Sequence, residues 1–305
     1  MQNSRIEVHR ETPTPRDRYT GLSGVLKLKL KALSYIHVGS GAEAITIPSV
    51  DEVESMLRMG LDRIIGELSR KIGSDFQENV KVSKKPCIPG ATIKGKTRSR
   101  IELTVPSRGD GKKWSCFSKA TSPQSGRKQT AWRHRKLWGE TTVTQDRGPS
   151  CDPTRENMVC LTCDMFGAAG MQGLVHFNDF VGELGMLEKI SGEFGMKLEA
   201  IRPGSELVGN IYFRNLSEAR LGLLLYGLGI CGAPHGGKIL IGRLKYRGKL
   251  AGKEFGVAAF TLTDIQFSAP RGAENLNALC RRLWEAAVKE YSVSEFDEVE
   301  RLGRA

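Results

Sequence analysis

The sequence lacks the long apolar runs of a membrane protein. No stretch of 18 or more apolar residues occurs, and the first twenty residues are polar, without the apolar segment of a secretory signal. These absences predict a cytoplasmic protein with no membrane partner. Disulfides are rare in that compartment, so we expect the seven cysteines to be reduced, buried or bound to metal. A chain of 305 residues can bury a core without disulfides.

Acidic residues are nearly missing from one long segment. Residues 81–136 contain sixteen Lys and Arg but only Glu102 and Asp110 as acids, so the segment carries +14 in a chain of net charge +12. Because ion pairs need nearby acids, we expect few of them here. A localised positive charge of this size favours a surface that binds the phosphates of a nucleic acid. The alternatives are a solvated basic face or a surplus of ion pairs of the kind found in thermophile proteins.

The hydrophobic pattern predicts a mixed α and β protein. Leucines alternate with lysines over residues 26–32, which is typical of a strand with one buried face. The expected helices cover about 50–72 and 91–104, a segment opened by Ser217, and the apolar positions 276–288. Further strands are expected near 174–177, 197–214, 239–246 and 257–267.

The order of these elements predicts the fold class. Apart from the 50–72 helix, the order is βαββαβ, which indicates an α+β, ferredoxin-like (RRM-like) core with helices on one face of the sheet. The other face is left open for a ligand. Residues 23–104 and 171–305 form this core. Residues 1–22 are expected to be a loosely held polar extension, and residues 105–170 a basic, cysteine-containing insertion.

A turn followed by a short basic helix is the first candidate binding site. Ile88-Pro89-Gly90 precedes the helix, whose N-terminal N–H groups are expected to point outward. Gly95 would let a sugar-phosphate backbone approach closely. The basic side chains expected to hold RNA phosphates are Lys94, Lys96, Arg98 and Arg100. A surface helix with lysines is the alternative.

A glycine-rich segment, residues 229–238, is the second candidate binding site. Glycines let backbone amides approach phosphates, although a glycine-rich hairpin is the commoner case. His37, before another glycine turn, is a candidate RNA contact or general acid/base, with a structural role as the alternative. Together with His37, four residues of this segment are expected to line the groove that binds RNA: His235, Gly236, Gly237 and Lys238.

Four cysteines lie in the insertion. Cys160 and Cys163 form a CxxC, a spacing that lets two thiolates grip one tetrahedral ion, and Cys116 and Cys151 lie upstream. Structural Zn²⁺ would stabilise an insertion that is poor in core residues. Two unrelated buried cysteines, a redox-active pair, and His134 as a substitute ligand are the alternatives. Nearby aromatic side chains are expected to anchor a small core or to stack on bases: Trp114, Phe117, Trp132 and Trp138.

Motifs for catalysis are few. The sequence has no HExxH and no Ser-His-Asp pattern. Metal-assisted phosphodiester cleavage, with Mg²⁺ or Mn²⁺, needs a carboxylate near the bound backbone. Asp51 and Asp75 are the candidates, and Asp51 has a second possible role in the first turn of its own helix.

These segments resemble the RAMP superfamily of CRISPR-associated proteins. His37-Val38-Gly39-Ser40-Gly41 looks like the first motif of the family, and Ile88 to Arg98 looks like its IPGxxxKGxxR motif. Asp164 to Gly167 is similar to a short phenylalanine-glycine motif, and the segment around Gly236 is similar to a C-terminal glycine-rich loop. The resemblance covers about residues 24–268.

Within the superfamily, the chain looks most like the backbone subunit of a type III effector complex. That resemblance implies a filament of copies or paralogues along a crRNA, contacts with its sugar-phosphate backbone, and a thumb-like hairpin that kinks the guide–target duplex. It also implies other effector subunits as partners and, in several relatives, an aspartate that cleaves target RNA. Asp75 is the closest positional match to that aspartate, and a zinc-bound insertion occurs in some relatives.

Three functional hypotheses follow. The first is a crRNA-binding backbone subunit that holds guide RNA and cleaves complementary target RNA if an aspartate binds metal. The second is a metal-independent endoribonuclease that processes crRNA with His37 as acid/base. The third is a non-catalytic, zinc-stabilised interaction subunit whose basic patch meets an acidic partner.

Overall fold

A computed structural model describes residues 7–44, 50–58, 76–116, 132–139, 150–192, 196–270, 272 and 274–303. The strands are β1 (Leu22–Ala32), β2 (Gly39–Ala44), β3 (Phe76–Asn79), β4 (Lys81–Val82), β5 (Lys85–Ile88), β6 (Val175–Phe177), β7 (Phe180–Val181), β8 (Leu187–Ser191), β9 (Lys197–Ile201), β10 (Glu206–Leu216), β11 (Ile239–Leu240), β12 (Lys249–Leu250), β13 (Lys253–Glu254) and β14 (Val257–Phe267). The helices are α1 (Val50–Leu57), α3 (Gly90–Thr104), α4 (Trp132–Trp138), α6 (Leu161–Phe166), α7 (Glu218–Gly227), α8 (Leu276–Tyr291) and α9 (Glu298–Leu302).

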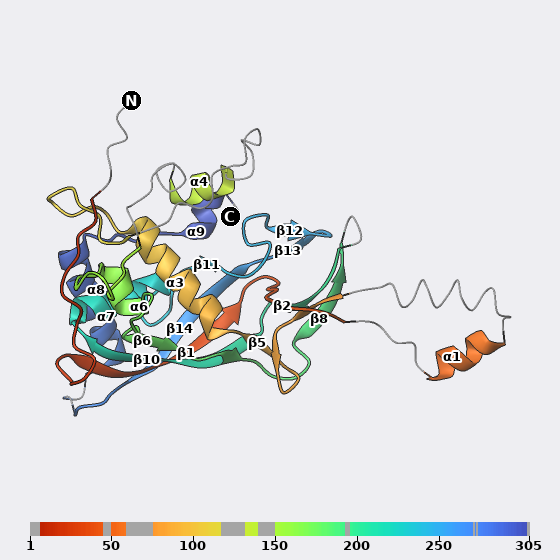
Figure 1. Cartoon of the computed structure of the whole chain (residues 1–305). Helices are drawn as coiled ribbons and strands as arrows, with labels where there is room; N and C mark the ends of the chain where they lie inside the picture. Colours follow the sequence, from red (N-terminus) through yellow and green to blue (C-terminus); the bar gives the residue numbers. More distant parts are fainter. Residues whose placement is uncertain are drawn as a thin grey trace.

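The centre of the molecule is an antiparallel sheet in the order β14-β1-β10-β6. Numbered as the four strands of βαββαβ, this order is 4-1-3-2, with α3 following the first strand and α7 the third (Figure 1). The predicted ferredoxin-like fold is therefore confirmed. The sheet is extended beyond β14 by β11, and beyond β10 by β7, β5 and β4.

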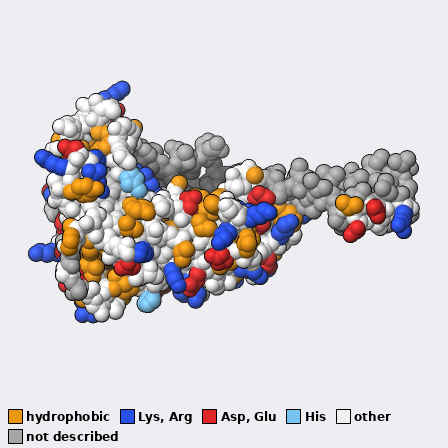
Figure 2. All heavy atoms as spheres, turned by 90° about the horizontal axis from the view of Figure 1, so that it is seen from below, with side chains coloured by type: hydrophobic (Ala, Val, Ile, Leu, Met, Phe, Trp, Pro, Cys, Tyr) orange, Lys and Arg blue, Asp and Glu red, His pale blue; other side chains and the backbone are white. Residues whose placement is uncertain are grey.

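The alternating sequence of β1 determines which face of the sheet is buried. Leu26, Leu28 and Leu30 are at most 2% exposed and join the core that α3, α7 and α8 complete. The lysines between them point to the opposite face, where Lys27 pairs with Asp264 at 3.3 Å and Lys29 with Glu206 at 3.4 Å. Figure 2, which views the molecule from below, shows basic, acidic and hydrophobic side chains intermixed on that side.

The helices that cover the core begin and pack as the sequence indicates. Ser217 caps α7 by accepting a hydrogen bond from the N–H of Arg220. Gly222 lets α7 approach α8 closely, because a Cβ there would lie 1.9 Å from the carbonyl oxygen of Leu283. Within the described helices, none is long and apolar enough to cross a membrane.

A second sheet lies beside the first, in the order β2-β3-β9-β8 (Figure 1). The predicted 50–72 helix begins as expected with α1, which covers residues 50–57. The remainder of that prediction, from residue 59 onward, lies outside the described residues. Figure 1 shows α1 well apart from both sheets.

The described part of the N-terminal extension, from residue 7 onward, is fixed to the body, which corrects the expectation that it is loosely held. Val8 and Glu11 form β-bridges with Lys113 and Val159. Thr14 then donates two hydrogen bonds to the carboxylate of Asp164, from its backbone N–H at 3.2 Å and its hydroxyl at 2.7 Å. The carboxylate also accepts from Arg220 at 2.7 Å, so the extension is linked to α6 and α7.

The described parts of the insertion also pack on the body. Trp138 is 7% exposed and stacks on Phe296 with ring centroids 5.6 Å apart. Trp114 meets Tyr291 edge to face at 4.9 Å. Both tryptophans therefore anchor core packing instead of offering a free face to bases. Phe117 and the side chain of Trp132 lie outside the described residues.

Candidate functional site

The N-terminus of α3 is closed by protein groups. A Cβ at Gly90 would lie 2.2 Å from the carbonyl oxygen of Phe177, so only glycine fits this approach of helix and strand. The N–H of Gly90 donates to the carboxylate of Asp179 at 2.8 Å. The expectation of outward-pointing N–H groups is therefore wrong at this first position, because Asp179 already provides the negative charge that the helix end favours.

One face of α3 points into the protein. Lys96 is 7% exposed and Arg100 is 2% exposed, and both bind the carboxylate of Glu298, which is fully buried. The Arg100–Glu298 hydrogen bond is 2.7 Å long. Burial lowers the pKa of Lys96, and Glu298 only partly offsets this. The predicted phosphate contacts by Lys96 and Arg100 need surface exposure, so the structure contradicts that role and gives both cations a partner inside the fold.

The opposite face of α3 carries Lys94, Gly95 and Arg98. Lys94 is half-buried, and in the described part of the chain no acid or hydrogen-bond acceptor engages its amine. Burial lowers the pKa of Lys94, and the positive charge of Arg98 adds to this effect. A Cβ at Gly95 would meet no heavy atom within 4 Å, so the helix surface is open beside Lys94. An anion bound here would neutralise Lys94, which has no acidic partner among the described residues.

Arg98 joins α3 to α6 and its C-terminal turn, which lie 65 to 69 residues later in the chain. Its Nε donates to Glu102 at 2.7 Å, one Nη donates to the carbonyl oxygen of Gly167 at 3.1 Å, and the other donates to Cys163 Sγ at 3.5 Å. All three guanidinium nitrogens thus have partners in the protein. The basic helix, the phenylalanine-glycine turn and the cysteine cluster, which the sequence separates by up to 69 residues, meet at this side chain.

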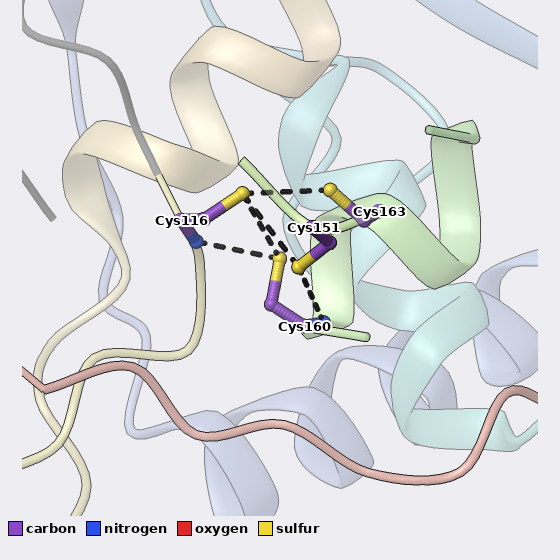
Figure 3. Close-up of side chains that lie close together, drawn as sticks. All are labelled: Cys116, Cys151, Cys160 and Cys163. Carbon is purple, nitrogen blue, oxygen red and sulfur yellow. Dashed lines mark hydrogen bonds between the residues drawn. The ribbon is translucent and has the colours of Figure 1, made fainter. Parts of the chain in front are cut away.

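Cys116, Cys151, Cys160 and Cys163 come together in one buried cluster (Figure 3). Cys116 Sγ lies 3.5 Å from Cys163, 3.6 Å from Cys160 and 3.9 Å from Cys151. Tetrahedral zinc with Zn–S bonds of ~2.3 Å would place its sulfurs about 3.8 Å apart, whereas a disulfide needs ~2.05 Å. The four side chains can therefore hold a metal ion such as zinc, and His134 is not needed as a ligand.

The surroundings of the cluster suit four thiolates. The N–H groups of Cys116 and Cys160 donate to the sulfurs of Cys160 and Cys151, at 3.3 Å and 3.2 Å. Burial disfavours the charge on Arg10, but Cys151 and the neighbouring thiols outweigh it and raise the pKa of Arg10. Four thiolates around one divalent ion carry a net charge of −2, which the guanidinium groups of Arg10 and Arg98 partly balance.

The glycine-rich segment runs along β14 and leads into the edge strand β11. The N–H of Gly236 donates to the carbonyl oxygen of Phe260 at 2.8 Å, and a Cβ at Gly236 would lie 3.0 Å from that oxygen. This glycine is thus needed for packing, as the hairpin alternative expects. Gly237 and Lys238 are exposed, and exposed His235 lies 3.4 Å from the hydroxyl of Thr261. Among these residues, Lys238 offers an exposed cation with no acidic partner in the described part of the chain.

His37 is fully buried where β1 leads into the second sheet. Its Nδ1 lies 2.6 Å from the carbonyl oxygen of Glu199 and must donate, because a carbonyl only accepts. Nε2 is therefore left with a lone pair, and it has no hydrogen-bond partner among the described residues. Burial lowers the pKa of His37, so the ring is neutral near pH 7. A cavity of about 270 Å³ adjoins it, lined by Gly39, Gly41, Gln77 and Arg243 among others.

Of the two candidate catalytic aspartates, Asp51 does not lie beside α3. Asp51 is exposed on α1, which Figure 1 shows far from α3. Asp75 lies outside the described residues. The carboxylates that the sequence reasoning missed are Glu298, Asp179 and Glu102, each of which binds a group of α3. Glu102 was detectable from its i,i+4 spacing to Arg98, but no local signal marks the other two.

The cations of residues 81–136 have more acidic partners than expected. Lys81 binds Glu199 at 2.9 Å, and Lys85 binds Glu183 at 2.8 Å. The amine of Lys112 lies 3.5 Å from the carboxylate of Glu7, which precedes residues 81–136 in the chain, whereas Glu183 and Glu199 follow them. The prediction of few ion pairs is wrong because other parts of the chain supply the acids. Lys81 lies on β4, Lys85 on β5, and Lys112 follows α3, so these three paired cations lie on separate parts of the fold.

Comparison with known proteins agrees with these motifs. The model of the RAMP superfamily matches residues 29–300. The chain belongs to the RAMP superfamily. Membership indicates a CRISPR-associated protein that binds RNA. No curated protein matches the sequence.

Proposed function

We propose that this RAMP protein is a crRNA-binding backbone subunit of a type III CRISPR ribonucleoprotein. It holds the guide by its sugar-phosphate backbone, next to target RNA, other effector subunits and copies or paralogues of itself in a filament. Lys94, beside Gly95, carries this proposal: it is a half-buried cation with no acidic partner in the described structure, on an open helix surface. Such a site suits a phosphate better than a base.

The proposed contacts are fewer than the sequence suggested. Lys94 and Lys238 provide charge, and Gly237 and His235 provide an exposed backbone and ring near Lys238. Arg98 shapes the site through its three bonds to the protein and adds positive potential. Recognition through backbone and shape leaves the choice of sequence to base pairing by the guide.

RNA binding by the purified protein tests the proposal. We expect the wild type to bind guide RNAs of unrelated spacer sequence with similar affinity, and the affinity to fall steeply with salt. Lys94→Ala should weaken binding and reduce the slope of log K against log salt by about one. Lys249→Ala removes an exposed lysine of β12 and is the matched control. Equal slopes for Lys94→Ala, Lys249→Ala and the wild type would contradict the proposed site.

We propose that Cys116, Cys151, Cys160 and Cys163 hold one structural Zn²⁺. The ion would contribute binding free energy to the fold of the insertion and would keep Cys163 in place for Arg98. Near-stoichiometric zinc in the gently purified protein is the expected result. Less than about half an equivalent would count against zinc as the resident ion.

Cleavage of target RNA is the second candidate function. It requires Mg²⁺ or Mn²⁺ at Asp75 or Asp51, and Asp51 is exposed and free to meet a metal. Cleavage by the assembled complex should stop in Asp75→Ala or in Asp51→Ala; unchanged cutting in both would remove these candidates. The metal-independent alternative is disfavoured because the Nε2 atom of His37 is buried. Cleavage of repeat RNA in EDTA that His37→Ala abolishes would restore it.

A further inference from the structure

Glu298 contacts both segments that we propose to bind RNA. One oxygen of its carboxylate accepts from Lys96 and Arg100 of α3. The other oxygen accepts from the N–H of Leu240 at 2.9 Å, two residues after Lys238. The side chain is fully buried, and Asp297 caps its helix α9 by accepting from the N–H groups of Val299 and Glu300 at 2.7 Å and 3.0 Å.

The contacts around Arg100 make this junction rigid. Its second Nη donates to the carbonyl oxygen of Phe296 at 2.7 Å. The guanidinium group lies 4.9 Å from the ring centre of Tyr226 and 5.5 Å from that of Phe296. Lys96 lies 5.5 Å from the ring centre of Trp138. Aromatic rings therefore exclude water from the charges, which strengthens the attraction between them and raises the cost of removing one partner.

The ionisation of Glu298 depends on both cations. Burial disfavours its charge, but Lys96 and Arg100 outweigh burial and lower the pKa of Glu298 overall. The group is thus a carboxylate near pH 7 and holds three donors from two distant segments. Glu298 thus joins α3 to β11 through side-chain hydrogen bonds, whereas Lys94 and Lys238 have no acidic partner among the described residues.

We propose that Glu298 is a positioning residue that sets α3 and the glycine-rich segment in one fixed arrangement for RNA. The inference rests on the proposed function, because it concerns the same two segments. Glu298 touches no RNA: it acts through Lys96 and Arg100 on the helix that presents Lys94, and through Leu240 on the strand that follows Lys238.

Hydrogen exchange tests the junction without RNA. In Glu298→Gln, amides of α3 and of residues 235–241 should lose protection together, because one side chain holds both. Amides of β8 and β9 should keep theirs. Glu300→Gln removes an exposed carboxylate from the same helix and should change neither segment. Loss of protection in α3 alone, or across the whole molecule, would overturn the proposal.

RNA binding tests the functional consequence. We expect Glu298→Gln to bind guide RNA at least tenfold more weakly than Glu300→Gln, at a temperature where circular dichroism shows both to be folded. In a double-mutant cycle, Lys94→Ala and Lys238→Ala should each cost less affinity in the Glu298→Gln background than in the wild type. A general loss of stability would leave these effects additive, and additivity would overturn the proposal.

Two further outcomes are informative. If Glu298→Gln does not fold, the double variant Lys96→Met/Glu298→Gln takes its place. It removes one positive and one negative charge together, which destabilises a protein less than removal of one partner of a buried ion pair. The same exchange pattern and the same cycle are then expected from that variant, and their failure would overturn the proposal equally. If the wild type binds no RNA, the proposed function fails, whereas the exchange result still decides whether Glu298 joins the two segments.

Discussion

The two faces of α3 carry the same types of basic residue in different environments. Lys96 and Arg100 point inward to a buried carboxylate, whereas the half-buried Lys94 lies on the opposite face with no acidic partner among the described residues. The two lysines are separated by one residue. On a helix, two residues correspond to about 200° of rotation, so neighbouring lysines in a motif need not share a role. Within the basic motif, Lys96 and Arg100 therefore stabilise the fold, whereas Lys94 lies on the surface that is a candidate for RNA contact.

The largest expected effect comes from the cysteine cluster, which touches only the outward face. If the cluster holds zinc as we propose, Cys163→Ser should remove most of it; the binding free energy of structural zinc sites is of order 10 kcal/mol. We expect hydrogen exchange to rise in residues 150–170 and around Arg98, whereas Lys96 and Arg100 keep their environment. Cys231→Ser, outside the cluster, is the control for loss of a thiol. Full metal content in Cys163→Ser would disprove the ligand set.

Next in size is the loss of a buried charge from the inward face. Arg100→Met leaves Glu298 with Lys96 alone and should lower the free energy of unfolding by about 3–5 kcal/mol. Lys94→Met, on the outward face, should change it by less than about 0.5 kcal/mol. Urea denaturation of both variants measures the difference. Similar values for the two would remove the distinction between the faces.

Lys96→Ala separates stability from RNA contact. Arg100 still neutralises Glu298 in this variant, so we expect a loss of about 2–3 kcal/mol. Because Lys96 reaches no phosphate, the salt slope of RNA binding should stay at the wild-type value, in contrast to Lys94→Ala. The measurement is a titration of RNA at several salt concentrations. A slope reduced by about one would instead place Lys96 at the RNA.

The smallest expected effect is that of Gly95→Ala, with another glycine of the same helix as its contrast. Gly95→Ala should stabilise the protein by about 0.5–1 kcal/mol, because alanine favours the helix and the added methyl group meets open space. It should also weaken RNA binding severalfold if a backbone lies against Gly95. Gly90→Ala is the contrast, since its methyl group would collide with Phe177 and destabilise the fold. Unchanged RNA affinity in Gly95→Ala would place the RNA elsewhere.

Local patterns in the sequence predicted the elements well. The period of two in β1, the Ser217 cap and the apolar positions of α8 each depend on residues a few positions apart, and all three are present. The cysteine cluster was also predictable, because only a few thiols were available and two of them had ligand spacing. The strand order followed from the order of the elements.

Long-range pairing was not predictable from the sequence. Glu298 lies 202 residues after Lys96, and nothing near either residue indicates that they meet. The same holds for Asp179 at the start of α3 and for the acids that bind Lys81, Lys85 and Lys112. The number of acids within a segment gives only the charge of that segment, whereas in the folded protein its cations pair with acids from distant parts of the chain. The sequence therefore predicted the helix itself, but not which of its cations are buried against acids from distant segments.

The late position of Glu298 has a consequence for synthesis of the protein. Lys96 and Arg100 leave the ribosome about two hundred residues before their counterion exists. Before Glu298 is synthesised, the helix carries two unpaired cations on the side that enters the core, and burying that side has a high free-energy cost. Completion of the helix's packing is thus among the last events of folding, and a nascent or C-terminally clipped chain would present a different set of charges from the finished protein.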